Sequence, residues 1–296
     1  MDWLEAIILG VIQGFTEFLP ISSSAHVRVV PELFGWEDPG ASFTAVTHGG
    51  SAVAIILYFA KDILRITDAW VRSLAHREAL RQDAVVPING PGPASHRRER
   101  SWDPADARLG WFVIIGTVPI VVAGVLLEDY VETEFRSLWI VAATFIVIGI
   151  VLWIADRYGS RTLHLDSLAV RYAVIIGLAQ VLALIPGTSR AGVVIATALL
   201  LGFQREAAAR FALLLAIPAV VGATIFEWSD AMGEEAVYAA GPTIAAVVAA
   251  FISSYAAIYW LLSWLQRRTF TPFVVYRVGV GVILIVLLAT GVLTAT

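Results

Sequence analysis

Residues 13–26 read QGFTEFLPISSSAH, which places a carboxylate, three consecutive serine hydroxyls and an imidazole inside otherwise apolar sequence. Polar groups at membrane depth are costly and generally face a partner or a functional cavity. A second stretch, residues 185–192, reads IPGTSRAG and adds an arginine to another apolar run. Together the two stretches predict a single polar site built from two halves of the chain.

The composition is typical of an integral membrane protein. The chain has 296 residues, of which 58% are hydrophobic and only 15% are charged, and its mean hydropathy is +0.79. Soluble domains of this length carry about 25% charged residues. The chain contains no cysteine, which excludes disulfides and thiolate nucleophiles, so a metal ion would need oxygen or imidazole ligands. We expect no nucleic-acid partner.

Six apolar runs are long enough for helices of about 20 residues, the length that crosses roughly 30 Å of hydrocarbon. They lie near 43–61, 109–127, 138–155, 207–226, 238–263 and 272–294. Two further apolar stretches, near 3–30 and 172–202, are interrupted by proline and small polar residues. Non-helical backbone at membrane depth survives only against protein or a water-filled cavity. These two stretches are therefore predicted to be re-entrant helical hairpins, with an ordinary kinked span as the alternative.

Basic residues set the predicted orientation. The segment from Lys61 to Arg108 carries nine of the chain's twenty Lys and Arg residues, which predicts a cytoplasmic loop over 62–108. Within it, residues 81–104 contain a Pro-Gly-Pro run without apolar periodicity and are expected to be flexible. The segments on the opposite side are acidic, and both termini are then expected outside the cell.

The predicted elements occur in the same order twice. Residues 1–155 contain one broken hairpin and three spans, and residues 156–296 contain a second set. Because three crossings is an odd number, the second half is predicted to be inverted. The fold class is then a single all-α polytopic membrane domain with an inverted-topology repeat, six transmembrane helices and two re-entrant hairpins.

An inverted repeat with discontinuous helices brings the polar tips together near the middle of the membrane. A faint sequence match supports the duplication, because FLPISSS at 18–24 can be aligned with LIPGTSR at 184–190. This alignment pairs Ser23 with Ser189.

The first tip carries groups suited to general base chemistry. Gln13 and Glu17 are four residues apart, so on a helix they present oxygens to one point. Ser23 and His26 are one helical turn apart, which would let the imidazole act as a general base toward the Ser23 hydroxyl. The alternatives are a Glu17 that is merely satisfied by hydrogen bonds and serines, Ser22 and Ser24 included, that cap a helix. Pro20 is expected to end the first helix.

The second tip has the features of an anion clamp. The Arg190 guanidinium keeps its charge and needs an anion in a membrane interior. Gly187 and Ser189 precede it and permit a tight turn whose backbone N–H groups would attract an anion as well. The alternative is an ion pair between Arg190 and Glu17 that ties the two halves together.

Two more polar residues lie in apolar runs. His48 begins the first span, and it is expected either to line the same cavity or to be a structural histidine. Arg277, in the last span, is expected to extend its side chain to the cytoplasmic surface.

The two tips together predict a function. An acid able to hold a divalent cation, a hydroxyl with a base and a phosphate clamp are the parts that phosphoryl transfer requires. A transporter or lipid flippase of the same architecture is the rival interpretation.

These residues resemble the signature motifs of the BacA/UppP family, the undecaprenyl-diphosphate phosphatases. The resemblance is carried by Gln13-x-x-x-Glu17-Phe18-Leu19-Pro20-Ile21-Ser22-Ser23-x-x-His26, by Pro186-Gly187-x-Ser189-Arg190-x-Gly192, by Leu214-Leu215-Ala216-Ile217-Pro218 and by Pro272-Phe273-x-x-Tyr276-Arg277. It implies a membrane enzyme that removes the terminal phosphate of a polyprenyl diphosphate. The released lipid carrier is reused for cell-wall synthesis, and the activity confers bacitracin resistance.

The resemblance also implies roles for single residues. Glu17, with Gln13 beside it, takes the acidic position associated with a divalent cation, Mg²⁺ or Ca²⁺. Ser23 and His26 take the catalytic positions, with Ser23 as nucleophile and His26 as base, or with His26 as the nucleophile. The diphosphate would be bound by Arg190, Ser189, Gly187, Ser22, Ser24 and Gln13. The active site is implied to open to the outer face of the cell membrane.

Three positions depart from the family pattern. Gln13 stands where many members have Glu, which removes one negative charge from the cation site. Ala191 and Val194 stand where the family usually has Ser and Thr, so two hydroxyls are missing from the second tip. The phosphate clamp is therefore expected to depend more heavily on Arg190 and Ser189.

Overall fold

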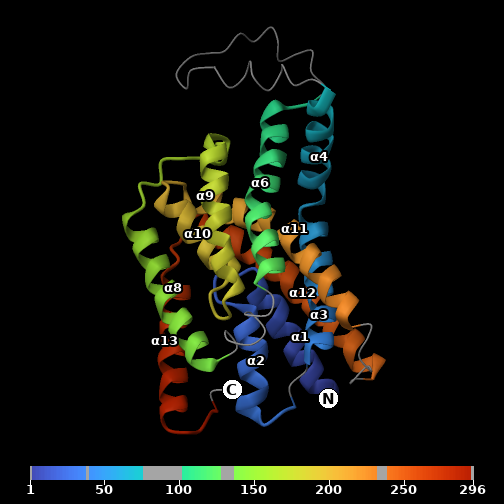
Figure 1. The fold of residues 1–296 in the computed structure, drawn as a ribbon, viewed down its shortest axis with the longest axis vertical. Helices are drawn as coiled ribbons and strands as arrows, with labels where there is room; N and C mark the ends of the chain where they lie inside the picture. The colour runs from blue at the N-terminus through green and yellow to red at the C-terminus, as the bar shows by residue number, and fades with distance from the viewer. Residues whose placement is uncertain (1, 38–39, 76–101, 128–136, 232–238, 295–296) are drawn as a thin grey trace.

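A computed structural model describes residues 2–37, 40–75, 102–127, 137–231 and 239–294. Helices make up nearly all of this part of the chain (Figure 1). Five of the described helices are long and apolar enough to cross a membrane. The predicted all-α polytopic membrane fold is confirmed at this level.

The first interrupted stretch forms two short helices, α1 (Trp3–Glu17) and α2 (Ser23–Phe34). Asp2 caps α1 in a capping box with Glu5, and the chain leaves the helix just before Pro20, as predicted. A helix of 12 residues, the length of α2, is only about 18 Å long and cannot cross about 30 Å of hydrocarbon by itself. The first stretch is therefore broken into two short helices rather than continuous.

The second interrupted stretch is broken in the same way. It forms α9 (Val170–Gln180), a 3₁₀ turn η4 (Val181–Leu184) and α10 (Arg190–Leu200). A further 3₁₀ turn, η3 (Leu165–Ser167), precedes α9. α9 and α10 have 11 residues each, so both are also too short to span the hydrocarbon alone.

The long helices agree closely with the predicted spans. They are α6 (Pro104–Leu126), α8 (Leu138–Tyr158), α11 (Arg205–Ala231), α12 (Ala240–Leu265) and α13 (Thr271–Ala289). α3 (Gly40–Tyr58) covers the remaining predicted span and meets α4 (Ala60–Ala75) at a bend of 72°. If that bent pair counts as one span, the described helices provide up to six.

The structure corrects the expectation of a loop over 62–108. Residues up to Ala75 continue as α4, and α6 begins at Pro104, capped by Asp103. α4 is helical because its buried residues recur at helical spacing, as Ile66, Ala69 and Ser73 show. Most of the flexible segment predicted at 81–104 lies outside the described residues.

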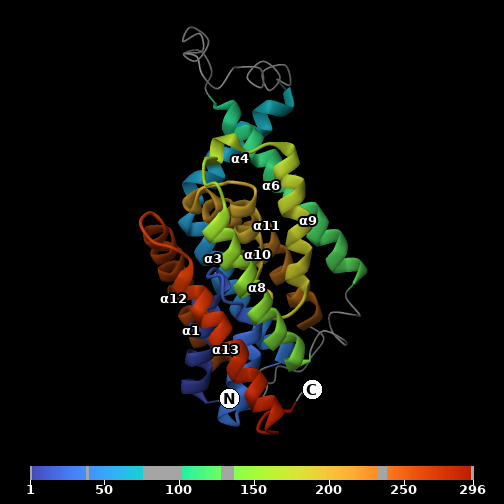
Figure 2. The same cartoon turned by 90° about the vertical axis from the view of Figure 1, so that its left-hand side faces the viewer.

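The helices are packed into an elongated bundle. α8 and α13 lie side by side along one edge, whereas α4 and the start of α6 extend beyond the rest of the bundle at one end (Figures 1 and 2). The described ends of the chain, Asp2 and Thr294, both lie at the opposite end (Figures 1 and 2).

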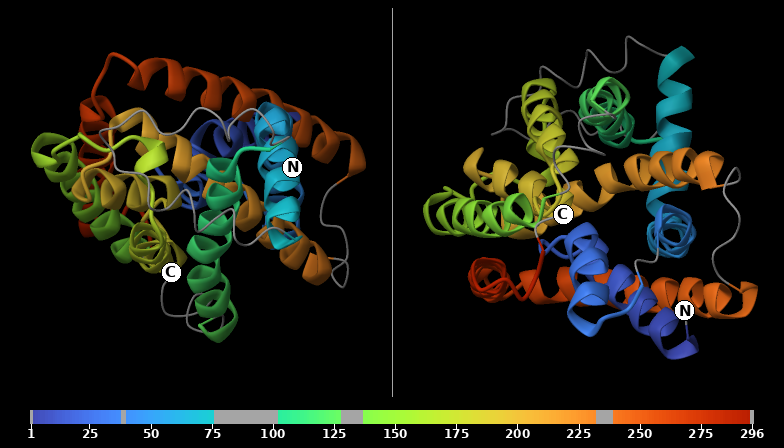
Figure 3. Two further views of the ribbon diagram at one scale, coloured as in Figure 1. Left: turned by 90° about the horizontal axis from the view of Figure 1, so that it is seen from above. Right: turned by 60° about the horizontal axis from the view of Figure 1, so that its bottom comes forward.

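α1 is packed along α12 with almost no space between the backbones (Figure 3). An added Cβ at Gly10 would lie 2.2 Å from the carbonyl oxygen of Ala246, and one at Gly14 would lie 2.2 Å from that of Ala250. Small residues allow this approach, on which helix association in membranes depends because lipid provides no hydrophobic driving force. The glycine at each of these positions therefore fixes α1, and with it Glu17 at its end.

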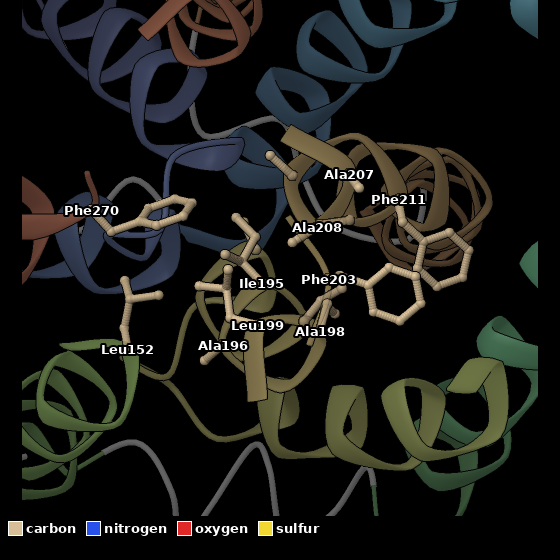
Figure 4. Packing of buried hydrophobic residues seen from close by; sticks show 14 of the residues in the cluster. Leu152, Ile195, Ala196, Ala198, Leu199, Phe203, Ala207, Ala208, Phe211 and Phe270 are labelled. Carbon is tan, nitrogen blue, oxygen red and sulfur yellow. The ribbon is translucent and has the colours of Figure 1, made fainter. Parts of the chain in front are cut away.

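The largest apolar core surrounds α10 (Figure 4). Residues from α8, α10, α11 and the start of α13 meet there, including Leu152, Leu199, Phe211 and Phe270. A short helix this deeply buried is held by packing on all sides, and its first residue, Arg190, is held with it. The core also contains Ala191 and Val194, the two positions where hydroxyls are missing.

We expect Gly10→Ala to destabilise the protein, because overpacking a tight interface costs about 1–3 kcal/mol. Gly222→Ala in α11 is the matched control, since an added Cβ there meets nothing within 4 Å. Thermal unfolding in detergent micelles should show a lower midpoint for Gly10→Ala and no loss for Gly222→Ala. Equal midpoints for the two variants would contradict the close packing of α1 on α12.

Candidate active site

The centre of the site is the carboxylate of Glu17, the last residue of α1, whose side chain is only 3% exposed. One carboxylate oxygen accepts a hydrogen bond from the Ser23 hydroxyl at 2.6 Å and from Nε2 of Gln13 at 3.0 Å. The other accepts one from Arg190 at 2.9 Å. A single carboxylate thus joins α1, the start of α2 and the start of α10, and the two predicted tips do form one site.

The contact between Arg190 and Glu17 is the ion pair that the sequence left as an alternative. Its side chains are 22% and 3% exposed, so the charges partly shield each other from the apolar surroundings. A buried carboxylate without a cation would be costly. The ion pair also leaves the Arg190 guanidinium at the site, where an anionic ligand could exchange with the carboxylate.

The predicted hydrogen bond between Ser23 and His26 is not the one the structure forms. Ser23 donates to Glu17, whereas Nδ1 of His26 lies 2.5 Å from the carbonyl oxygen of Ser22. Nε2 of His26 lies 2.6 Å from the hydroxyl of Tyr276 on α13. The reason is local: in the first turn of α2 the imidazole folds back over the preceding carbonyl instead of toward the Ser23 side chain.

Two serines hold the turns before α2 and α10 in the same unusual conformation. Ser22 has φ 73° and ψ 103°, and Ser189 has φ 66° and ψ 110°, both in a region that L-residues rarely occupy. The Ser189 hydroxyl caps α10 by accepting from the backbone N–H of Gly192 at 3.2 Å. The hydroxyls of Ser22 and Ser24 lie 3.3 Å apart, and Ser24 is exposed.

The same turns direct the N-termini of α2 and α10 toward the region of Glu17. The Ser189 hydroxyl is also 3.4 Å from the carbonyl oxygen of Leu19, so the two turns touch. Helix N-termini carry unpaired N–H groups and a partial positive charge. Two of them beside Arg190 form a suitable environment for phosphate oxygens.

Gly187 is required by the geometry of the second turn. Its φ is 85°, and an added Cβ would lie 2.2 Å from the hydroxyl oxygen of Thr144 on α8. The Thr144 hydroxyl donates to the carbonyl oxygen of Pro186 at 2.9 Å. Gly187 therefore shapes the loop, and sequence reasoning missed the contribution of Thr144 because its contact is a long-range one.

Arg277 contradicts the expectation that it reaches the surface, because its side chain is fully buried. It donates hydrogen bonds of 2.8–3.3 Å to the main-chain carbonyl oxygens of five residues. Those residues belong to the first turn (Pro20), the second turn (Gly187 and Thr188) and α8 (Thr144 and Phe145). The carbonyl oxygens of both turns are available as acceptors because they have no N–H partner within a helix. Only the tertiary structure brings these carbonyls to the Arg277 side chain.

His48, on α3, reaches the same site. Its Nε2 is 3.5 Å from a carboxylate oxygen of Glu17, and its side chain is 15% exposed. His48 therefore lies beside Glu17, at the junction of α1, α2 and α10. Tyr276, by contrast, is a site residue that the residue patterns alone did not reveal, although the polar pair Tyr276-Arg277 inside an apolar span was a usable signal.

The donor set suits a hard cation rather than a transition metal. No cluster of three or more His, Cys, Asp or Glu side chains that could hold a metal occurs in the described part of the chain. However, Oε1 of Gln13 is buried without a hydrogen-bond partner, while Nε2 of the same amide donates to Glu17. A buried acceptor that lacks a donor is expensive, and oxygen ligands from Glu17 and Gln13 fit Mg²⁺ or Ca²⁺.

Comparison with known proteins finds a matching family and several similar chains. A family described as bacitracin resistance protein BacA matches residues 6–283. The undecaprenyl-diphosphatase of a Nocardioides species is 49% identical, with 100% of both chains covered. The undecaprenyl-diphosphatase of Micrococcus luteus is 45% identical with the same coverage, and undecaprenyl-diphosphatase 2 of Frankia casuarinae is 47% identical over 99% of this chain and 97% of its own.

We expect Arg277→Lys to be poorly tolerated despite keeping the charge. A lysine offers three donors on one nitrogen and cannot serve carbonyls in three segments, and each buried acceptor left unpaired costs about 1–3 kcal/mol. The thermal unfolding midpoint in detergent should fall clearly. Arg157→Lys, at an exposed position on α8, should leave it unchanged. A wild-type midpoint for Arg277→Lys would show that the five hydrogen bonds do not support the loops.

Proposed function

The chain belongs to the BacA family of bacitracin resistance proteins, and we propose that it hydrolyses undecaprenyl diphosphate to undecaprenyl phosphate and inorganic phosphate. The observation that carries the proposal is the contact of one buried carboxylate, Glu17, with both a hydroxyl nucleophile and an arginine. The first contact suits attack on phosphorus, and the second suits binding of a diphosphate. The substrate class comes from the relatives' activity, and the chemistry from this geometry.

Arg190 binds the diphosphate by exchanging Glu17 for phosphate oxygens. Guanidinium and phosphate form bidentate, charge-assisted hydrogen bonds, which are stronger than a single contact to a carboxylate. Ser189, Gly187, Ser22 and Ser24 line the two turns beside it, with the N-termini of α2 and α10. The free enzyme thus keeps Arg190 paired until the substrate arrives.

Ser23 is the nucleophile, and Glu17 accepts its proton. Oγ of Ser23 attacks the terminal phosphorus, the anhydride P–O bond breaks, and the lipid leaves as its monophosphate. Water then cleaves the phosphoserine to release inorganic phosphate and restore the hydroxyl. The 2.6 Å contact supports this division of roles, because a strong acceptor on the hydroxyl is what activates a serine.

His26 serves the second half of the reaction. It lies in the first turn of α2 together with Ser23, and its Nε2 can take a proton from the attacking water. Direct attack on phosphorus by His26 is the competing version. It is less well supported, because Nε2 is engaged by Tyr276 whereas the Ser23 hydroxyl already has its acceptor.

A divalent cation, Mg²⁺ or Ca²⁺, belongs in this proposal as the cofactor. Glu17 would hold it, with the unpaired Oε1 of Gln13 as a second ligand. When bound, the cation supplies positive charge that offsets the negative charge of the phosphates. Gln13 in place of a second carboxylate implies weaker binding than a site with two negative ligands.

The proposal includes an inverted repeat that places the site between two halves. A constant sequence offset relates residues of equal character in α1–α2 and α9–α10: Ala6 and Ala173, Gly10 and Gly177, Gln13 and Gln180, Ser22 and Ser189, and Gly35 and Gly202. The paired alanines are fully buried, the paired serines share one backbone conformation, and Gly35 and Gly202 both have positive φ. This register pairs Ser22 rather than Ser23 with Ser189, one residue away from the alignment expected from sequence.

The remaining parts of the proposal concern the membrane. The two broken segments enter and leave on one side as re-entrant hairpins, both termini lie outside the cell, and the active site opens outward. The support is the excess of basic residues between Lys61 and Arg108 and the position of both described termini at the opposite end (Figure 1).

We expect purified protein to release phosphate from undecaprenyl or farnesyl diphosphate with Mg²⁺ or Ca²⁺ and to lose that activity in EDTA. Ser23→Ala should lower kcat on the order of a thousandfold while the lipid still binds, because the nucleophile is gone. Ser167→Ala, at an exposed position in η3, is the control and should behave as wild type. If the protein were a transporter, Ser23→Ala would change only its affinity for the lipid. A lack of phosphate release by the wild type with either cation would contradict the proposed phosphatase activity.

The orientation can be tested with single cysteines, because the chain has none of its own. Glu37→Cys should react with a membrane-impermeant maleimide in intact cells. Ser167→Cys should react only after the membrane is permeabilised. Both positions are exposed in the structure, so access depends on the side of the membrane. The reverse labelling pattern would contradict the proposed topology.

A further inference from the structure

The contact between His26 and Tyr276 is not used by the reaction as described above. The two residues are far apart in sequence, yet Nε2 of His26 and the hydroxyl of Tyr276 are 2.6 Å apart. Their rings are also stacked, with centroids 5.6 Å apart and planes at 9°. A second ring, Phe145, lies 5.7 Å from the imidazole. The imidazole is therefore held by a hydrogen bond at Nε2 and by contacts with the rings of Tyr276 and Phe145.

The hydrogen-bond partners assign the tautomer of the imidazole. Nδ1 faces the carbonyl oxygen of Ser22, which can only accept, so Nδ1 carries a hydrogen. In a neutral ring Nε2 is then the unprotonated nitrogen, and it accepts from the Tyr276 O–H. The nitrogen that a base or nucleophile needs is thus the one that Tyr276 covers.

The position of Tyr276 is fixed by its neighbour in sequence. Arg277 ties α13 to both turns through carbonyls of Pro20, Gly187 and Thr188, so the register of α13 relative to α2 is set. The phenol is nevertheless free on its other side. It is 42% exposed and borders an open cavity of about 860 Å³ that is also lined by Arg267, Arg268 and Trp264. Tyr276 therefore borders open space, and we infer that its ring can turn into that space and leave Nε2.

We propose that Tyr276 is a positioning residue for His26. Tyr276 orients the imidazole with Nε2 as the basic atom, and it moves away from Nε2 when the attacking water binds there. The inference rests on the proposed function, because it assigns His26 to water activation. In the resting site the Tyr276 O–H occupies the position beside Nε2 that the O–H of the attacking water would take. When the phosphoserine forms, a water molecule takes that place and gives its proton to Nε2. Its oxygen bonds to phosphorus, and the Ser23 oxygen leaves phosphorus and takes back the proton that Glu17 accepted.

The test is a double-mutant cycle on phosphate release. Tyr276→Phe keeps the stacked ring and removes only the hydroxyl, and Tyr259→Phe, at an exposed position on α12, is the matched control. Tyr276→Phe should lower kcat about tenfold to a hundredfold with KM within about twofold, and Tyr259→Phe should change neither. In a His26→Gln background, Tyr276→Phe should have no further effect. An equal loss in both backgrounds would overturn the inference.

A spectroscopic measurement separates this inference from the proposed function. In protein labelled with ¹⁵N-histidine, the Nε2 signal of His26, identified by its absence in His26→Gln, should shift in Tyr276→Phe and not in Tyr259→Phe. A lack of phosphate release by the wild type would overturn the proposed function. Activity in the wild type with an unchanged kcat and an unchanged His26 signal in Tyr276→Phe would overturn the role of Tyr276 alone.

Discussion

The arrangement of the whole site depends on the way Arg277 satisfies backbone carbonyls deep in the protein. Breaking a helix at membrane depth leaves carbonyl groups without partners, and no water is available to replace them. Arg277 supplies donors to carbonyls of both broken segments and of α8 from a fully buried position. Its guanidinium also lies 4.9 Å from the ring centroid of Phe145, which adds a cation–π contact. One side chain therefore satisfies carbonyl groups that the breaks in two helices leave unpaired.

Once the two turns are held together, the catalytic groups have little freedom. Glu17 ends α1, Ser23 begins α2 and Arg190 begins α10, so each side chain leaves a rigid helix end toward the same place. The tight packing of α1 on α12 and the burial of α10 in the largest core fix those ends. Rigid elements position reacting groups better than loops do. The strained serines before α2 and α10 are the local cost of aiming two helix N-termini at one site.

The two broken segments, α1–α2 and α9–α10, share a local backbone conformation but carry different chemistry. Gln13 and Gln180 each keep a buried side-chain oxygen without a partner. Only the first half, however, has a carboxylate at the end of its first helix, and only the second has an arginine at the start of its second helix. This difference lets the Glu17 carboxylate and the Arg190 guanidinium meet between the two segments, where their charges offset each other.

Much of the fold was predictable from sequence because the bilayer imposes simple rules on length and polarity. Runs of about 20 apolar residues predicted the long helices to within a few residues, and Pro20 and Pro186 marked the breaks. The polar residues of the two tips predicted most of the site, since Glu17, Ser23 and Arg190 had no other reason to lie in apolar sequence. The helix α4 was missed because charged residues of its outer face alternate in sequence with the residues of its buried face, so its composition resembles that of a loop.

The sequence by itself therefore determined most of the residues that form the site, and it distinguished the long apolar helices from the two broken segments, because both follow from local hydrophobicity and polarity. Only the tertiary structure decided which groups meet. Ser23 is bonded to Glu17 rather than to His26, His26 is bonded to Tyr276, and Arg277 is buried rather than exposed. Hydrogen-bond partners depend on side-chain directions and on helix packing between residues hundreds of positions apart. Spacing along one helix specifies neither.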